Sequence, residues 1–254
     1  MTTEQVYVSE DEQMLNLERQ NEILELLIQR KSMTVKALAE LLFASESTIR
    51  RDLNELEKAG KVRRTFGGVV LEETLTKEVP RILRKSQNYQ AKQMIAKKAR
   101  EYIENGKVIF LDASTTVAHL VPILSEFSDL TVITNSPATA MKLGEERIRT
   151  FCTGGELLMT SQAFVGTQSE EFIKGFNADI MFFSSRGISE DGRITDSSIE
   201  ESRIRQVMMG QAKRKIYMFD SSKLGREYMF NLCHVKEADA FITEKSDILF
   251  EKGN

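Results

Sequence analysis

Hydrophobic positions near the start of the chain recur at helical spacing in three short segments. These stripes fall within residues 17–28, 35–42 and 49–56, which predicts three amphipathic helices. Thr34 and Ser45 stand just before the second and third stripes, where a hydroxyl can accept a hydrogen bond from the first free backbone amides of a helix. We expect these two residues to cap their helices.

A glycine and a short hairpin follow the third stripe. Gly60 stands where helices commonly end, and VRRTFGGVVL (62–71) holds two β-prone runs around a Gly-Gly pair, which predicts a hairpin. Three short helices followed by a hairpin are typical of a winged helix-turn-helix, although helix spacing alone also fits a three-helix packing module. We assign residues 16–71 to this small domain and residues 1–15, which are polar and acidic, to a tail.

Beyond residue 107 the pattern changes to apolar strand candidates that alternate with helical stretches. The strand candidates are 107–112, 130–134, 149–153, 179–185, 215–220 and 239–243, and the helical stretches are 115–127, 137–146 and 200–213. This alternation predicts an α/β domain with a mostly parallel sheet and helices on both faces. We assign residues 91–254 to it and place a linker, which contains Pro80, at residues 72–90.

Composition narrows the class of protein without adding chemistry. Hydrophobic residues make up 41% and charged residues 29% of the chain, as in ordinary globular proteins, and the net charge of −3 gives no overall basic field. Cys152 and Cys233 are far apart and only two histidines are present, so we expect no metal, no cofactor and no disulfide framework. The N-terminus lacks the pattern of a secretory signal, and no apolar run approaches the roughly 18 residues of a membrane span. We therefore expect a cytoplasmic protein without a membrane partner.

Local charge at the third stripe points to nucleic acid. Between residues 50 and 64, six basic residues stand against three acidic ones. A recognition helix places its first residues at base edges in the major groove, where short hydroxyls and arginines are suited to bond bases and phosphates. We predict that this helix contacts operator DNA through its start, at Ser45, Ser47, Thr48, Arg50 and Arg51.

The two neighbouring arginines cannot act alike, because consecutive helical residues point about 100° apart. One is expected at a base edge or phosphate and the other in an ion pair, with Glu55 as the candidate partner of Arg51. A surface ion pair is the alternative for any single arginine. Arg63, Arg64 and Thr65 of the hairpin are expected to lie along phosphates, which positions the domain without reading sequence.

The sequence STIRRDLNELEKAGKVRRTFGGVVL (47–71) resembles the helix-turn-helix and wing of the DeoR family of bacterial sugar-metabolism regulators. The resemblance extends over residues 16–245. It implies a sensor domain that resembles ribose-5-phosphate isomerase and binds phosphorylated sugars. The family's phosphate motif, Asp-x-Gly-Ser/Thr-Thr-Thr, falls here on Asp112, Ala113, Ser114, Thr115 and Thr116.

The residues of this motif also suit an anion on physical grounds. They follow a strand candidate and open a predicted helix, whose free amides and dipole attract negative charge. A plain helix cap is the alternative. Further family positions at strand ends are Asn135, Gly155 and Lys223, of which Lys223 is the favoured charge partner of a phosphate.

Three other positions bear on the effector. Glu201 matches a family glutamate, and it could instead pair with Arg205 four residues on. The chain departs from the family at Ser114, where the motif has glycine, and at Arg186, where Asp or Asn is common. An arginine at this position could bind a phosphate bidentately or reject the family's usual sugars.

These features predict a repressor of a carbohydrate-utilisation operon that a phosphorylated sugar releases from its operator. A dimer or tetramer would place two recognition helices about 34–36 Å apart on a pseudopalindromic site. We expect no catalytic residues and no enzyme activity. One alternative is a sugar-phosphate isomerase that uses Asp112 and Glu201 as candidate bases. Another is a nucleic-acid binder without sequence choice.

Overall fold

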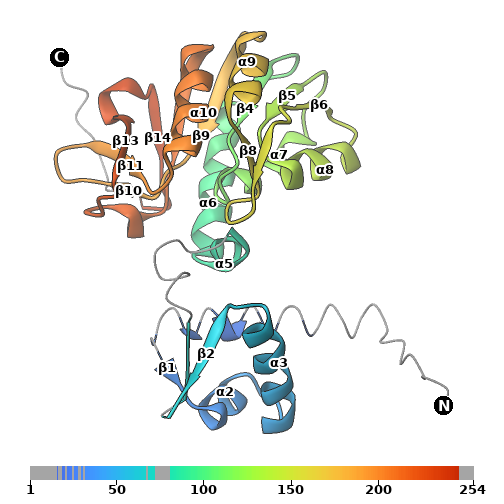
Figure 1. The fold of residues 1–254 in the computed structure, drawn as a ribbon. Coiled ribbons are helices and arrows are strands. Elements are labelled where there is room, and N and C mark those ends of the chain that lie inside the picture. The colour runs from blue at the N-terminus through green and yellow to red at the C-terminus, as the bar shows by residue number, and fades with distance from the viewer. Residues whose placement is uncertain are drawn as a thin grey trace. The chain divides into compact units, whose positions relative to one another are not determined.

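The computed structural model describes residues 32–66, 68–71 and 81–245, together with separate residues between 16 and 30. The chain divides into two compact units, residues 1–87 and 88–254, which are described one at a time (Figure 1). The predicted tail and the linker up to residue 80 lie outside the described residues.

The N-terminal unit contains the predicted helices and hairpin. The described residues between 16 and 30 are helical. The other elements are β1 (Ser32–Met33), α2 (Val35–Leu41), α3 (Glu46–Lys58), β2 (Val62–Thr65) and β3 (Gly68–Leu71). Both predicted caps are confirmed, because Thr34 Oγ1 accepts a hydrogen bond from the Ala37 amide and Ser45 Oγ accepts one from the Thr48 amide, each at 3.1 Å.

A short strand that the sequence did not predict completes the hairpin. β1 pairs antiparallel with β3, so the sheet order is β1-β3-β2. Gly68 lies at this junction, where an added Cβ would come within 2.3 Å of the Met33 carbonyl oxygen. Glycine is therefore required there by the close approach of two strands. The core beneath joins all the helices to the sheet through Ile23, Leu24, Leu27, Met33, Leu38, Ala39, Ile49, Leu53, Leu56, Val62 and Val69.

The C-terminal unit is built on a six-stranded parallel sheet, which confirms the predicted architecture. Its strands are β4 (Val108–Leu111), β5 (Thr131–Thr134), β6 (Arg149–Cys152), β9 (Ala178–Phe183), β12 (Ala212–Met218) and β14 (Ala240–Ile242). They lie in the order β14-β12-β9-β4-β5-β6, and every pairing is parallel. Each of the six strand candidates corresponds to one of these strands.

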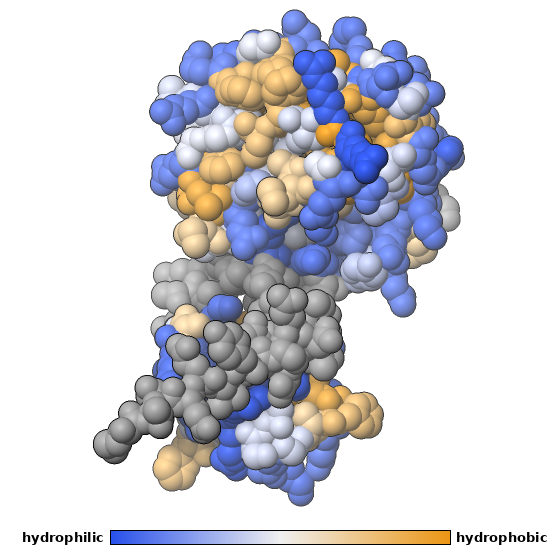
Figure 2. Space-filling view, turned by 90° about the vertical axis from the view of Figure 1, so that its right-hand side faces the viewer, coloured by the Kyte–Doolittle hydropathy of each residue, from blue (hydrophilic) through white to orange (hydrophobic). Residues whose placement is uncertain are grey.

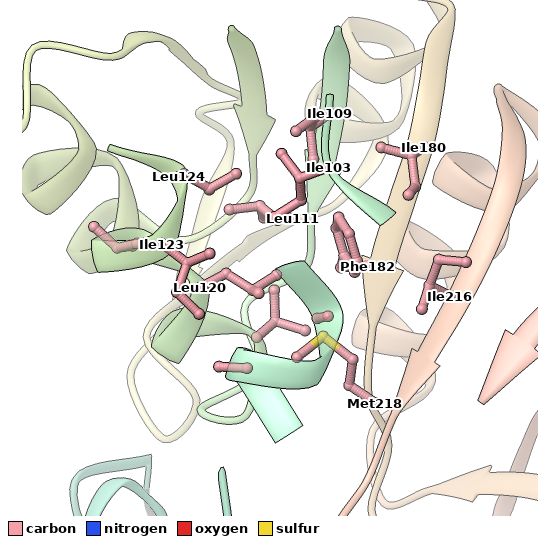
Figure 3. Close-up of a cluster of buried hydrophobic side chains, with 14 of the residues drawn as sticks. Ile103, Ile109, Leu111, Leu120, Ile123, Leu124, Ile180, Phe182, Ile216 and Met218 are labelled. Carbon is pink, nitrogen blue, oxygen red and sulfur yellow. The ribbon is translucent and has the colours of Figure 1, made fainter. Parts of the chain in front are cut away.

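Each central strand sends alternate side chains into two separate cores. In β9, Ile180 and Phe182 enter one core while Met181 and Phe183 enter the other. Figure 3 shows the first core, where side chains of β4, β9 and β12 meet Leu120, Ile123 and Leu124. The alternation follows from the two-residue period of a strand, and it requires helices on both faces of the sheet.

Helices cover both faces of this sheet. The helical elements of this unit are α6 (Tyr89–Ala99), η1 (Arg100–Tyr102), η2 (Val117–Leu120), α7 (Val121–Leu124), α8 (Pro137–Glu145), α9 (Thr167–Lys174), α10 (Ile199–Gly210), η3 (Ser221–Lys223) and η4 (Val235–Glu237). A further helix, α5 (Arg81–Ser86), belongs to the N-terminal unit. Residues of α6, η2, α7 and α8 enter the first core, and residues of α9 and α10 enter the second. Helical structure thus begins inside the segment predicted as linker, because α5 and α6 start before residue 91.

Two smaller sheets and one shortened helix were not predicted. β7 (Glu156–Leu158) and β8 (Ala163–Val165) form a hairpin, and β10 (Gly187–Ile188), β11 (Arg193–Asp196) and β13 (Phe230–His234) form a three-stranded antiparallel sheet. The helix predicted over 115–127 consists of the 3₁₀ turn η2 and the four-residue α7.

Candidate DNA-contact surface and effector site

The start of α3 presents a group of hydroxyls on the surface. Ser45, Ser47 and Thr48 are not buried. The Ser45 hydroxyl lies 2.8 Å from the hydroxyls of both Ser47 and Thr48. The predicted contact residues are therefore gathered at one helix end, with the Ser45 hydroxyl already used as the cap.

The two arginines of α3 have different surroundings, as predicted, but the expected ion pair is wrong. Arg50 donates to Glu46 at 3.1 Å, one turn earlier in the helix. Glu55 does not pair with Arg51; its Oε2 accepts hydrogen bonds from Asn16 and Gln20 instead. Among the described residues Arg51 makes no hydrogen bond or ion pair, and its side chain is exposed. Arg51 is therefore the arginine available to a ligand.

The hairpin arginines also differ from each other. Arg64 donates to Asn54 at 2.5 Å and lies 3.4 Å from Glu57, so it ties the hairpin to α3. Arg63 is exposed and makes no hydrogen bond or ion pair within the described ranges. Thr65 donates its hydroxyl hydrogen to the Gly68 carbonyl at 3.2 Å and closes the turn. Only Arg63 of these three offers an unused cation to a phosphate.

Sequence reasoning missed the residue that anchors α3. Asp52 is fully buried and accepts from Arg19 Nε at 2.5 Å and from Arg19 Nη2 at 3.1 Å. These hydrogen bonds raise the pKa of Arg19 above its ordinary value. Asp52 shares the helix face of Ile49, Leu53 and Leu56, all of them buried. A carboxylate on an otherwise apolar stripe was the signal that could have revealed it.

The predicted effector residues lie where the strands of the large sheet end, at their carboxyl termini. Asp112 follows β4, Asn135 follows β5, Gly155 follows β6, Arg186 follows β9 and Lys223 follows β12. Since all six strands are parallel, their carboxyl ends lie at the same end of the sheet. The chain leaves β4 toward β5 but leaves β9 toward β12. The junction of β4 and β9 is thus the point where strand order reverses, which is where open α/β sheets bind ligands.

Lys223 lies in η3, just after β12, and its side chain extends to this junction. Its Nζ donates to Ser184 Oγ at 2.7 Å and lies 3.5 Å from Thr116 Oγ1. The side chain of Lys223 is only 15% exposed, and Asp220 Oδ2 is 4.0 Å from its ammonium group. The fold therefore brings together two predicted residues that are 107 positions apart, along with Ser184, which the sequence did not single out.

Asp112 has its hydrogen-bonding capacity occupied by the protein itself. Its carboxylate accepts from the amides of Ser114 at 3.0 Å and Ser184 at 3.1 Å, and from Arg205 Nε at 2.7 Å. The strand ends of β4 and β9 are thereby linked. This arrangement makes Asp112 a positioning residue, and it leaves the carboxylate poorly suited to act as the base of an isomerase.

Arg205 holds three buried carboxylates together. Besides Asp112 it contacts Asp196 through Nη1 at 3.0 Å and Glu201 through Nη2 at 3.4 Å, and all four side chains are at most 4% exposed. Burial lowers the pKa of Arg205, but the attraction of Asp196, Asp112 and Glu201 outweighs it and leaves that pKa above its ordinary value. The predicted Glu201–Arg205 pair is confirmed, whereas Asp196 was not recognised.

Arg186 and Ser114 are the two departures from the family pattern. Arg186 Nε lies 3.9 Å from Asp196 Oδ1, and its side chain is 12% exposed. Ser114 Oγ accepts from the Val117 amide at 3.2 Å, and Ser114 is not among the described residues with positive φ. Serine therefore occupies the glycine position without backbone strain.

The loop after β4 offers hydroxyls more than it offers a helix dipole. Ser114, Thr115 and Thr116 are each at most 6% exposed. The helix after them is shorter than predicted, so its dipole attracts an anion less than expected. Any charge recognition at this loop depends chiefly on Lys223 and these hydroxyls.

Asn135 and Gly155 have distinct surroundings. Asn135 Nδ2 donates to the Phe164 carbonyl at 3.0 Å, while its buried Oδ1 finds no partner among the described residues. Gly155 has φ of 105°, and an added Cβ would lie 2.5 Å from Ser169 Oγ and 2.7 Å from the Val165 carbonyl. Gly155 thus permits close packing of the chain against β8 and α9.

Two surface hollows open at the opposite end of the sheet. One is bordered by Thr131 and Arg149, at the amino ends of β5 and β6, and the other by Ile180 and Arg214 of β9 and β12. Neither includes a predicted site residue. In the described part of the chain, no group of three or more His, Cys, Asp or Glu side chains is arranged to hold a metal ion.

Comparison with known families covers most of the chain. Residues 19–74 match the DeoR-like helix-turn-helix domain, and residues 87–245 match the DeoR C terminal sensor domain. None of the helices in the described ranges has both the length and the apolar character of a membrane span.

Curated relatives align over nearly their whole length. The HTH-type transcriptional regulator GlpR of Haloferax volcanii is 33% identical over 91% of this chain and 91% of its own. The lactose phosphotransferase system repressor of Staphylococcus epidermidis is 33% identical over 92% and 94%. The L-fucose operon activator of Escherichia coli is 32% identical over 91% and 96%.

Solved structures match the sheet domain less closely. The ribose 5-phosphate isomerase A of Methanocaldococcus jannaschii is 18% identical, covers 54% of this chain and 55% of its own, and has a TM-score of 0.41. A likeness at this level carries no conclusion about activity.

Proposed function

This chain belongs to the DeoR family of transcriptional regulators, and on that premise we propose that it represses a carbohydrate-utilisation operon until a phosphorylated sugar releases it. A relative named as a lactose system repressor supports repression, while a relative named as an operon activator makes the direction of control a point for experiment. We propose the cytoplasm as its location, because that is where it would meet operator DNA.

The observation that carries the effector half of the proposal is the position of Lys223. Its ammonium group lies against Ser184 and Thr116 where the strand order reverses. A phosphate there would take the ammonium group as its charge partner and the hydroxyls of Ser114, Thr115 and Thr116 as donors. Asn135 Oδ1, which has no hydrogen-bond partner in the described part of the chain, is an acceptor suited to a sugar hydroxyl.

Release from DNA requires that the effector distinguish two states of the protein. An effector that bound both equally would change nothing, and couplings of about 1–3 kcal/mol are typical. We propose a homo-oligomer, a dimer or tetramer, whose recognition helices match a pseudopalindromic operator about one helical turn apart. The effector would favour an arrangement that no longer matches this spacing.

The experiment is a mobility-shift titration of the full chain on a duplex that the wild-type protein has selected from a randomised pool. Sugar phosphates and their unphosphorylated sugars are added separately. We expect at least one sugar phosphate, and no free sugar, to release the DNA. Indifference of DNA binding to every phosphorylated sugar would contradict the effector half of the proposal.

Lys223→Ala and Thr115→Ala should keep the protein on DNA in the presence of the releasing compound. The matched control is Lys213→Ala, because Lys213 is 74% exposed and pairs with Asp179 away from the carboxyl ends of the strands. If Lys223→Ala is released at wild-type effector concentration, the phosphate binds elsewhere.

A further inference from the structure

Two phenylalanines of the N-terminal unit are left almost entirely in water. Phe43 is 98% exposed and Phe66 is fully exposed. Figure 2 shows hydrophobic side chains protruding from the mostly hydrophilic surface of this unit. Single exposed apolar residues are common on surfaces, so position and surroundings must decide whether these two have a role.

Phe43 stands in the turn between α2 and α3, two residues before the cap of the recognition helix. Its φ is 49°, in the left-handed region. A bulky side chain is disfavoured there, and glycine or asparagine would fit better. Because the ring lies in solvent, no packing contact offsets the cost of this backbone conformation. Phe43 therefore contributes nothing visible to the folded state of the unit.

Phe66 stands at the apex of the hairpin. It follows Thr65, whose hydroxyl closes the turn onto Gly68. β2 and β3 pair in register up to this point, from Val62 opposite Leu71 to Thr65 opposite Gly68. The hairpin thus holds Phe66 at the tip of a short, well-paired ribbon.

The charges nearby indicate what kind of partner covers these rings. Arg51 follows the turn of Phe43 on α3, and Arg63 precedes Phe66 on β2. Both are exposed, and neither forms an ion pair with any described residue. Exposed cations on the same elements as, or next in the chain to, exposed aromatic rings suit a polyanion that also has apolar surface, which describes a nucleic-acid duplex.

We propose that Phe43 and Phe66 are DNA-contact residues that add apolar recognition to the polar contacts of α3 and the hairpin. Phe43, next to the helix start that enters the major groove, contacts thymine methyl groups. Phe66, at the hairpin tip, packs against base edges or sugars in the adjoining minor groove. This inference rests on the proposed binding of operator DNA.

The test measures the affinity of the full chain for the duplex selected by the wild-type protein, over a range of salt concentrations. Phe66→Ala should weaken binding about ten-fold, as loss of an aromatic contact with bases does, and leave the slope of log K against log salt unchanged. Arg63→Ala, by contrast, should lower the magnitude of that slope by about one, because one phosphate contact is lost. A Phe66→Ala protein with wild-type affinity would overturn the role of Phe66.

The contact of Phe43 has its own test. Replacing thymines of the duplex by deoxyuridine removes the methyl groups and should weaken wild-type binding at one or more positions. Phe43→Ala should bind the thymine duplex more weakly and become insensitive to that replacement. If wild type and Phe43→Ala lose the same factor on every uracil duplex, Phe43 does not contact a methyl group.

A stability measurement separates contact from structure. Phe43→Gly should raise the thermal midpoint, because it removes the strained φ without removing a packed side chain. A lower midpoint would show that the ring packs in the folded protein and would overturn the proposal for Phe43.

Controls distinguish a failure of this inference from a failure of the proposed operator binding. Met229→Ala removes an exposed apolar side chain of the other unit, 85% exposed, and should leave affinity unchanged. Failure of the wild-type chain to select any duplex overturns the proposed function and this inference together. Selection by the wild type with unaltered binding by both phenylalanine variants overturns this inference alone.

Discussion

The two units of this protein use arginine in opposite ways. In the N-terminal unit, Arg51 and Arg63 are exposed and have no acidic partner among the described residues. In the C-terminal unit, Arg205 is 4% exposed and is surrounded by three carboxylates. An exposed cation keeps its hydration and is free to exchange it for a phosphate, whereas a buried one is costly unless its partners are fixed.

The difference separates contact residues from positioning residues. Arg205 joins the loop after β4 to the start of α10 through Asp112 and Glu201, so it positions that loop. Asp52 plays the same part in the N-terminal unit, where it joins α3 to Arg19. Each unit thus has an ionic link that sets the geometry of a candidate site.

The largest effect should come from Arg205→Met. Removing the guanidinium leaves three buried carboxylates without their cation, which should cost the C-terminal unit about 3–5 kcal/mol. Urea denaturation followed by circular dichroism measures this loss. Arg205→Lys keeps a cation and should be intermediate, and a loss as large for Arg205→Lys as for Arg205→Met would contradict the electrostatic explanation.

The second effect tests whether the N-terminal unit depends on its own buried link. Asp52→Ala removes both hydrogen bonds to Arg19 and should destabilise this unit by about 1–3 kcal/mol. The cost is smaller than for Arg205, because Arg19 is 21% exposed and regains water. Denaturation of Asp52→Ala, Arg19→Ala and the double variant measures the coupling. Additive losses would show that the pair contributes no more than its separate side chains.

The third effect concerns binding rather than folding. Arg51→Ala should weaken binding to the selected duplex by about 1–3 kcal/mol and leave the denaturation curve unchanged. Arg50→Ala should cost less, because Arg50 is already engaged with Glu46. Fluorescence anisotropy provides both affinities. A larger loss for Arg50→Ala would reverse the roles that the ion pair assigns.

The smallest effect is a pH dependence at Asp220. Burial raises the pKa of Asp220, but Lys223, Ser222, Lys92 and Asn88 together outweigh it and leave the pKa below its ordinary value. A depressed folded-state pKa contributes stability above the unfolded value, about 3.9, that is lost as the pH falls through the folded value. Asp220→Asn should therefore lower the urea midpoint at neutral pH, and the difference should narrow below about pH 4. A constant difference would contradict it.

The sequence predicted those parts of the fold that have a strong period. The six parallel strands and both capped helices were correct, because each depends on local patterns of apolar residues or on one hydroxyl. β1 and the antiparallel sheet of β10, β11 and β13 were missed, since these strands are specified by pairing with distant segments rather than by their own apolar pattern. The helix after Thr116 was predicted too long. Its first turn is 3₁₀ and its α-helical part spans only Val121–Leu124.

For the candidate sites, the sequence predicted which residues belong to them but not which partners those residues contact. The hydroxyls and arginines of α3 were recognised, but not that Arg50 pairs with Glu46 while Glu55 Oε2 accepts from Asn16 and Gln20. Lys223 was recognised as a strand-end residue and its role at a phosphate stays a prediction, whereas its neighbour Ser184 was not recognised. Such choices follow from contacts between distant segments, which a single sequence does not contain.

The strand order also has a consequence for the protein during its synthesis. β4 emerges first among the parallel strands yet lies at the centre of the sheet, and β12 with Lys223 joins only after some 100 further residues. The core of the N-terminal unit, in contrast, is complete by Val69. Domains fold in order as they leave the ribosome. The N-terminal unit can therefore fold before Lys223, the proposed charge partner of the effector, has been synthesised. A chain cut short between them keeps the core of the N-terminal unit and loses β12 with Lys223, so truncations in this interval test whether the proposed oligomer, and operator binding with it, depends on the C-terminal unit.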